Sequence, residues 1–190
     1  MRKLVTWDMM TLDGYFEGKS PWSLDFHSLV WGEELEAYSL QQLEEVGTLL
    51  FGRRTYEGMA RHWEAETGAV ADRMNVVEKI AATRTGTTVK WSNARVLQGD
   101  ISDHLAALKG ESDKKGIFVF GSADLTATLL EQQVVDEIRL CLVPTILGGG
   151  NPLFKNDATR KDFKLIEARP FKSGGVLLRY VRADAEAIRL

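Results

Sequence analysis

The sequence lacks most of the features that would link it to a membrane, a nucleic acid or an oxidising compartment. It has one cysteine, Cys141, so neither an internal disulfide nor a cysteine-rich zinc site can form, which fits a reducing compartment. No run approaches the roughly 18 consecutive apolar residues of a membrane span, and Asp8 and Asp13 interrupt any secretion-signal core. The 24 basic and 27 acidic residues form no basic block, and the formal net charge is -3. We therefore expect a cytoplasmic protein that binds neither nucleic acid nor membranes.

Prolines, repeats and low-complexity tracts are also scarce, so nothing divides the chain into parts. Four prolines are scattered along 190 residues, and no linker-like segment occurs. A hydrophobic fraction of 44% and a charged fraction of 27% are ordinary for a globular protein. With a typical domain size of about 150 residues, this length predicts one domain over residues 1–190.

Apolar runs alternate with helical patterns along most of the chain. Short buried strands are predicted over residues 3–8, 48–51, 78–83, 94–97, 116–120 and 137–143. Helices are predicted over 33–46, from about 55, from about 102 and after 122, and a long functional loop is expected over 9–32. Residues 162–168 and 175–181 are typical of two antiparallel strands around a Lys-Ser-Gly-Gly turn. The pattern predicts an α/β fold with a mixed sheet closed by an antiparallel C-terminal hairpin.

Two strand-to-helix junctions carry a glycine followed by small or basic residues. In the first, Gly52 permits close approach of a ligand, Arg53 supplies positive charge and Thr55 can donate a hydrogen bond. The second places Gly121 and Ser122 before a helix whose N-terminus could receive a phosphate. Each junction is also typical of an ordinary turn into a capped helix, so the residues alone leave both interpretations open.

A third phosphate-binding candidate is the pair Thr83 and Arg84, at the end of the strand predicted over 78–83. An arginine there could select NADP over NAD through the 2′-phosphate, or it could be an exposed side chain at a strand end. The chain has no G-x-G-x-x-G fingerprint, which disfavours an ordinary Rossmann dehydrogenase. No residue spacing suggests a metal site or a Ser-His-Asp arrangement.

Five segments occur in an order that is more informative than any of them alone. They are MTLDGYFEG at 10–18, LFGRRTY at 50–56, VFGSA at 119–123, VDEIRL at 135–140 and PTILGGGNPLF at 144–154. With these segments the chain resembles the dihydrofolate reductase-like superfamily, in particular the branch with the reductase domain of the riboflavin-biosynthesis deaminase–reductase. The resemblance covers nearly the whole chain. It implies a three-layer α/β/α fold with a mixed, mainly parallel sheet, NADPH as cofactor and a homodimer.

The resemblance also implies roles for residues at the strand ends. The cofactor phosphates are expected at Gly52, Arg53 and Thr55, the adenosine end at Thr83 and Arg84, and the pyrophosphate at Gly121, Ser122, Ala123 and Leu125. The nicotinamide and substrate are expected beside Thr11, Leu12, Asp13 and Gly14, and beside the loop 147–150 with Gly148. Asp13 and His27 are the predicted catalytic residues, although Asp13 also fits an ordinary Asp-Gly turn.

Because of two departures from the family pattern, the substrate of the relatives cannot be assumed for this chain. The second junction has Gly121-Ser122 where folate reductases have a glycine doublet, and the C-x-x-C motif of the deaminase domain is absent. We expect a stand-alone, NADPH-dependent reductase acting on a C=N or C=O carbon of a small pyrimidine- or pterin-like substrate. The alternative is a non-catalytic nucleotide-binding or regulatory dimer that kept the fold. The aromatic residues of the first loop could wall a pocket for a flat ring, pack the loop onto the core or take part in a dimer contact; they are Tyr15, Phe16, Trp22 and Phe26. A nicotinamide pocket filled by Tyr15 or Trp22 would favour the non-catalytic alternative.

Overall fold

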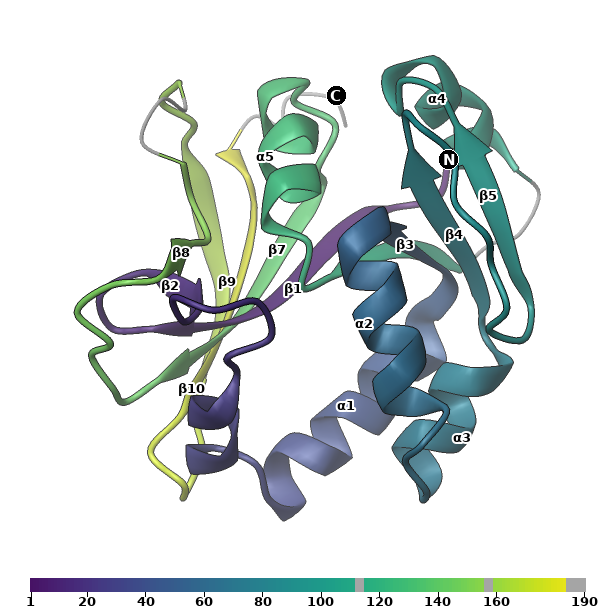
Figure 1. Cartoon of the computed structure of the whole chain (residues 1–190). Helices are drawn as coiled ribbons and strands as arrows, with labels where there is room; N and C mark the ends of the chain where they lie inside the picture. The colour runs from purple at the N-terminus through teal and green to yellow at the C-terminus, as the bar shows by residue number, and fades with distance from the viewer. Residues whose placement is uncertain (112–114, 156–158, 184–190) are drawn as a thin grey trace.

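The computed structural model describes residues 1–111, 115–155 and 159–183, which build a central eight-stranded sheet (Figure 1). The strands follow the order β5-β4-β3-β6-β1-β7-β10-β9 across it. Their bounds are β1 Leu4–Thr11, β3 Val46–Gly52, β4 Glu78–Thr83, β5 Ala94–Gln98, β6 Gly116–Phe120, β7 Glu137–Val143, β9 Phe163–Pro170 and β10 Val176–Arg182. A separate pair is formed by β2 (Tyr15–Glu17) and β8 (Asn151–Pro152).

The six strands from β5 to β7 run parallel, and β10 is antiparallel to both β7 and β9. This confirms the predicted mixed, mainly parallel sheet closed by an antiparallel hairpin. Strand β1 lies at its centre, with Trp7 opposite Phe120 of β6 and Arg139 of β7. Because parallel strands end at one edge, the loops after β1, β3, β4, β6 and β7 lie along that edge.

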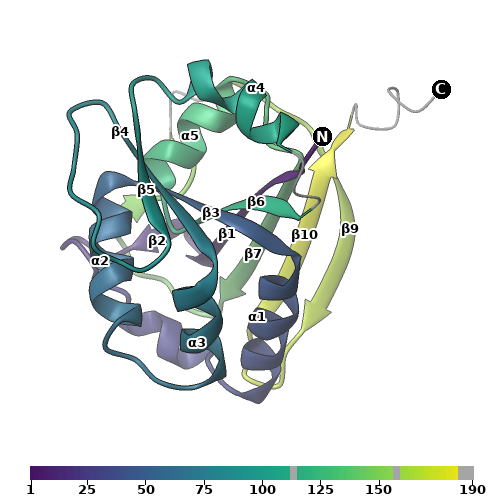
Figure 2. The ribbon, with the colours of Figure 1, turned by 90° about the vertical axis from the view of Figure 1, so that its right-hand side faces the viewer.

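Helices cover both faces of the sheet, which gives the expected three layers (Figure 2). The helices α1 (Glu33–Glu45), α2 (Arg53–Trp63) and α3 (Ala69–Val76) pack on one face, and α4 (Ser102–Gly110) and α5 (Ala123–Glu131) pack on the other. Side chains alternate along β1, since Val5 and Trp7 belong to the core under α1 whereas Leu4 belongs to the core under α5.

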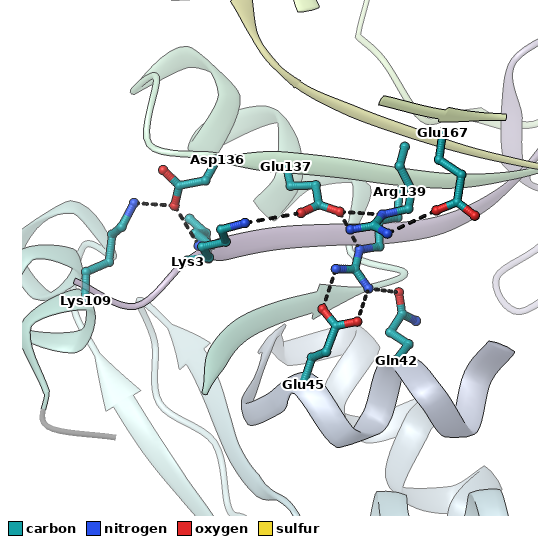
Figure 3. A network of polar contacts seen from close by, with 10 residues as sticks. Lys3, Gln42, Glu45, Lys109, Asp136, Glu137, Arg139 and Glu167 are labelled. Atoms are coloured by element: carbon teal, nitrogen blue, oxygen red, sulfur yellow. Dashed lines mark hydrogen bonds and ion pairs between the residues drawn. The ribbon is translucent and has the colours of Figure 1, made fainter. Parts of the chain in front are cut away.

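A buried ion network ties the layers together at the start of β7, away from the strand-end loops (Figure 3). Glu137 accepts hydrogen bonds at 2.8 Å from both Arg139 and Arg179, and its side chain is 1% exposed. Arg139 also donates to Glu45 of α1 at 2.6 Å, and Arg179 of β10 donates to Glu167 of β9 at 3.0 Å. The network therefore connects one helix with three strands.

The sequence patterns missed elements that depend on distant partners. The loop expected over 9–32 contains the end of β1, the strand β2 and a 3₁₀-helix, η1 (Asp25–Leu29). β1 extends to Thr11 because it pairs with β7 as far as Val143, a contact that no local pattern records. Helix α3 was not predicted, and α2 begins at Arg53, two residues before the expected start.

Candidate functional site

The two glycine junctions meet at the carboxyl edge of the sheet. Strands β3 and β6 are neighbours, so the turns that follow them lie side by side. The Gly52 amide donates to Ser122 Oγ at 3.2 Å, and Thr55 Oγ1 donates to the Gly121 carbonyl at 3.3 Å. Segments seventy residues apart in the chain thereby form one surface.

Glycine is required at one of these turns and fits the other. Gly121 has φ +62°, a left-handed conformation that a side chain disfavours, and a Cβ there would lie 3.4 Å from Met59 Cε. Gly52 has extended backbone, and its nearest neighbours would be Ser122 Oγ at 3.9 Å and Leu125 Cβ at 4.0 Å. Ala123 is buried in the first turn of α5, beside this contact.

The N-termini of α2 and α5 both reach this surface without a side-chain cap. Ser122 is the N-cap of α5, but its hydroxyl accepts from Gly52 instead of from its own helix. Thr55 is the third residue of α2, not its cap, and the N-cap is Gly52. Neither helix therefore has a side-chain cap, so the first-turn amides could receive an anion, while the interpretation of each junction as an ordinary turn stays open.

Basic side chains flank the two helix ends. Arg53 and Arg54 begin α2 and are exposed, with Arg53 3.4 Å from Glu57 in an exposed pair. Arg84 follows β4 on the same edge, is 79% exposed and lies 3.7 Å from Asp100. Thr83, by contrast, is buried, and its hydroxyl accepts from the Thr85 amide at 3.3 Å within a local turn.

On the other side of β1, Asp13 links the turn that follows β1 to the loop that follows β7 by hydrogen bonds. Its carboxylate accepts from Thr11 Oγ1 at 2.6 Å, from the Leu147 amide at 3.2 Å and from the Gly148 amide at 2.8 Å. The Thr11 hydroxyl bond, helped by the two amides, lowers the pKa of Asp13 below its usual 3.8. Asp13 is therefore ionised at neutral pH and holds the segment expected at the substrate side. Leu12 is more than half exposed beside it.

His27 lies on η1, which packs against β7. Its ring meets Phe26 edge-on, with centroids 4.7 Å apart, and its Nε2 is buried without a hydrogen-bond partner in the described part of the chain. Burial lowers the pKa of His27 to about 4, and nearby Asp25 offsets this in part. The imidazole is therefore neutral at physiological pH.

Trp22 connects the first loop with helix α2. The Trp22 amide donates to Glu17 Oε1 at 2.6 Å, and Trp22 has φ +66°, unusual for a residue with a bulky side chain. Its indole lies against Gly58 of α2, where an added Cβ would be 1.7 Å from the ring. Tyr15 instead sits in β2 opposite Pro152. Trp22 thus packs the loop onto α2.

One further ionisable residue, Asp8, is buried near the carboxyl ends of the strands and was not among the predicted site residues. Asp8 lies on β1 opposite Leu140 of β7, is 3% exposed, and neither of its carboxyl oxygens has a hydrogen-bond partner among the described residues. Burial raises its pKa to about 7, and the nearby Gly121 amide offsets part of the effect. The signal in the sequence was a charged residue inside an otherwise apolar strand, which we used only to exclude a secretion signal.

Two negative observations apply to the described residues. They contain no group of three or more His, Cys, Asp or Glu side chains that could hold a metal ion. None of their helices is long and apolar enough to cross a membrane. A cavity of about 500 Å³ lies among Leu130 of α5, Leu140 of β7, and Phe163 and Tyr180 of the C-terminal hairpin.

The strand order, the three layers and the joined glycine turns define the dihydrofolate reductase-like fold, as the sequence predicted. Comparison with known proteins places the chain within that class: residues 2–177 match the family model described as the RibD C-terminal domain. The chain belongs to the RibD C-terminal domain family, which confirms the resemblance inferred from the five segments.

Individual relatives agree with this membership. The chain is 26% identical over 184 residues to an uncharacterized protein of Bacillus subtilis, YyaP, covering 94% of each chain. A putative riboflavin biosynthesis protein from Shewanella sp. PV-4 has a similar structure, with a TM-score of 0.79, 20% identity and coverage of 95% and 98%. A Thermotoga maritima diaminohydroxyphosphoribosylaminopyrimidine deaminase/5-amino-6-(5-phosphoribosylamino)uracil reductase matches with a TM-score of 0.69 and 16% identity. The match covers 96% of this chain but 57% of that longer one.

Proposed function

We propose that this protein is an NADPH-dependent reductase of a small pyrimidine- or pterin-like substrate. The observation that carries the proposal is the meeting of two uncapped helix N-termini at the Gly52 and Gly121 turns. Family membership supports a RibD-like reductase, and the name of the Thermotoga relative suggests the substrate class.

The residues at the edge fit a dinucleotide. The amides that begin α2 and α5 would bind its phosphates, with Gly121 allowing the backbone to come close and Arg53 adding charge. Bound NADPH would supply the hydride, while the chain supplies orientation, charge and exclusion of water. Asp13 would position the loop at Leu147 and Gly148 next to the reacting groups.

Neither predicted catalytic residue is poised to donate a proton at neutral pH. Asp13 is ionised, because its hydrogen bonds lower its pKa, and we propose that it positions the loop. His27 is neutral, with a pKa near 4, so we propose that its imidazole forms a hydrogen bond to the substrate and carries no charge. Both roles stay predictions.

The first test is a titration with NADPH and NADH, followed by tryptophan fluorescence. We expect at least about tenfold tighter binding of NADPH, because Arg84 would pair with the 2′-phosphate. Arg84→Ala should weaken NADPH binding alone about tenfold, and Arg53→Ala should weaken both nucleotides. The matched control is Arg160→Ala, because Arg160 is exposed and lies outside the proposed cofactor site. This variant should bind NADPH and NADH as the wild type does. Failure of both nucleotides to bind at millimolar concentration would contradict the proposal.

Turnover separates the reductase from the non-catalytic alternative. NADPH consumption at 340 nm, with pyrimidine and pterin compounds as candidate substrates, should identify a reducible ring. A protein that binds NADPH tightly but reduces none of them would instead be the nucleotide-binding module.

The homodimer belongs to the same proposal. Strand β9 is the last strand of the sheet and exposes Leu165 and Ile166 at 47% and 48%, which is unusual for large apolar side chains on a free edge. A second copy covering β9 would bury them. Light scattering should give about twice the mass of 21.3 kDa, and Ile166→Asp should reduce it to the monomer.

A further inference from the structure

The buried Asp8 carboxyl lies beneath the start of α5. It lies on the same side of β1 as Thr6, two residues earlier, and this face of the sheet is covered by α5. Thr6 Oγ1 and Thr126 Oγ1 of α5 are, like the Asp8 oxygens, buried without a hydrogen-bond partner among the described residues. Buried polar groups are normally paired, so an unpaired buried carboxyl next to a proposed ligand site needs a functional reason.

Among the described residues, none supplies a counter-charge to Asp8. On β7 it faces Leu140, and Arg139 lies beside Trp7 on the other face, held by Glu45 and Glu137. At the turn after β6, the Gly121 amide donates to the Trp7 carbonyl at 3.3 Å and partly lowers the pKa of Asp8.

Several ionisable groups of the neighbouring helices and loops pair with other residues, and Arg54 at the start of α2 is exposed. Asp124 of α5 is exposed and lies 3.0 Å from Lys155. At the start of α2, Arg53 pairs with Glu57, and at the end of β1, Asp13 binds the loop amides. The amide end of α5, which begins at the Gly121–Ser122 turn, is thus a positive element close to Asp8.

We propose that Asp8 is a positioning residue whose carboxyl must be protonated when a dinucleotide occupies the Gly121–Ser122 turn. This inference rests on the proposed function. An ionised Asp8 and the cofactor phosphates would be two anions at one helix N-terminus, and the low polarity around Asp8 would strengthen their repulsion. A protonated Asp8 removes that repulsion and gains an O–H donor for Thr6, Thr126 or the ligand.

The consequence is a linkage between binding and protons. Because the pKa of Asp8 is about 7 in the free protein, most molecules lose this proton as the pH rises from 7 to 9. Binding must then take the proton back, so the Kd for NADPH should rise about tenfold per pH unit above 7. Below pH 6 the Kd should not depend on Asp8.

The test measures the Kd for NADPH by tryptophan fluorescence from pH 6 to pH 9, for wild type, Asp8→Asn and Asp103→Asn. Asparagine keeps the shape of the neutral acid, so Asp8→Asn should bind with little change between pH 7 and 9. Asp103 is an exposed acid on α4, and its variant should keep the wild-type slope. Isothermal titration of wild type at pH 8 in two buffers of different ionisation enthalpy should show uptake of about one proton, which needs no variant.

The outcomes separate this inference from the function. Tight binding at pH 6 with a flat Kd up to pH 9 and no proton uptake would overturn the role of Asp8 while leaving the reductase proposal intact. The same slope in Asp8→Asn would overturn it also, and would point to another group, such as Lys79, whose buried amine has its pKa lowered to about 8. Absence of NADPH binding at pH 6 would remove the proposed function and this inference with it.

Discussion

Two aspartates on β1 and its following turn show how strongly surroundings decide the chemistry of one residue type. Asp13 is exposed and accepts hydrogen bonds from a hydroxyl and two amides, so its pKa falls. Asp8 is five residues earlier, buried and without such donors, so its pKa rises to about 7. The resemblance to the family points to Asp13 for catalysis, yet of these two acids Asp8 is the one that can carry a proton at neutral pH.

Removing the Asp13 carboxylate should loosen the loop after β7. In Asp13→Ala the Leu147 and Gly148 amides lose their acceptor, and their hydrogen exchange should accelerate about tenfold. Because the pKa is lowered on folding, the contact is fully present above pH 3.8 and is lost as the pH falls through the lower folded value.

Asp100→Ala is the matched control for Asp13→Ala. Asp100 is another exposed acid with a lowered pKa, and it accepts from the Ser102 amide at 3.0 Å. Its variant should accelerate exchange at Ser102 and leave Leu147 and Gly148 unchanged. Unchanged protection of these two amides in Asp13→Ala would show that the loop is held by other contacts.

At the scale of elements, the first loop and α2 depend on each other. For Trp22, one of the aromatic residues of this loop, the structure shows packing, since its ring lies on the backbone of Gly58. A glycine inside α2 is unfavourable for the helix by about 1 kcal/mol relative to alanine. Its presence is explained by the indole, which occupies the space that a Cβ would need.

Gly58→Ala should therefore displace the loop even though alanine favours the helix. We expect changed tryptophan emission and faster proteolysis between Gly18 and Leu24, because the indole must leave α2. Gly110→Ala, in α4 with nothing within 4 Å of the new Cβ, should leave both unchanged. In a Trp22→Ala background, Gly58→Ala should gain up to about 1 kcal/mol of stability. An unchanged emission spectrum in the single variant would refute this coupling.

At the scale of the molecule, the ion network at the start of β7 connects α1 with β7, β10 and the edge strand β9 (Figure 3). Glu137 is the shared acceptor of Arg139 and Arg179, and both the Glu137 and Arg139 side chains are nearly fully buried. Breaking a buried pair by removing one partner leaves an uncompensated charge, which costs far more than losing a surface pair.

Glu137→Gln should lower the free energy of unfolding by about 3–5 kcal/mol, as measured by urea denaturation. The matched control is Glu66→Gln, whose exposed pair with His62 at 3.9 Å should contribute about 0–1 kcal/mol. A loss in Glu137→Gln no larger than in the control would mean that the two arginines find other acceptors. NADPH binding at the opposite end of the sheet should persist in the folded variant.

The predicted and observed elements differ mainly where long-range pairing adds structure. The strands predicted over 78–83 and 116–120 agree with β4 and β6. Each is a short apolar run between turn residues, a pattern that can be read from the local sequence alone. The end of β1, together with β2 and β8, was missed, because these strands exist through partners more than a hundred residues away. The prediction of one domain over residues 1–190 and that of a cytoplasmic location stay predictions.

The sequence by itself determined the α/β alternation, the closing hairpin and the two glycine junctions, since apolar periodicity and glycine positions are local properties of the chain. It also determined the family, through five short segments in a fixed order. Only the tertiary structure decided that Gly52 and Gly121 share one surface, that Ser122 serves the neighbouring turn and that Trp22 rests on α2. It also decided that Asp8, and not Asp13, is the acid that can hold a proton near neutral pH. Burial and hydrogen-bond partners set these properties, and both are supplied by residues far away in the chain.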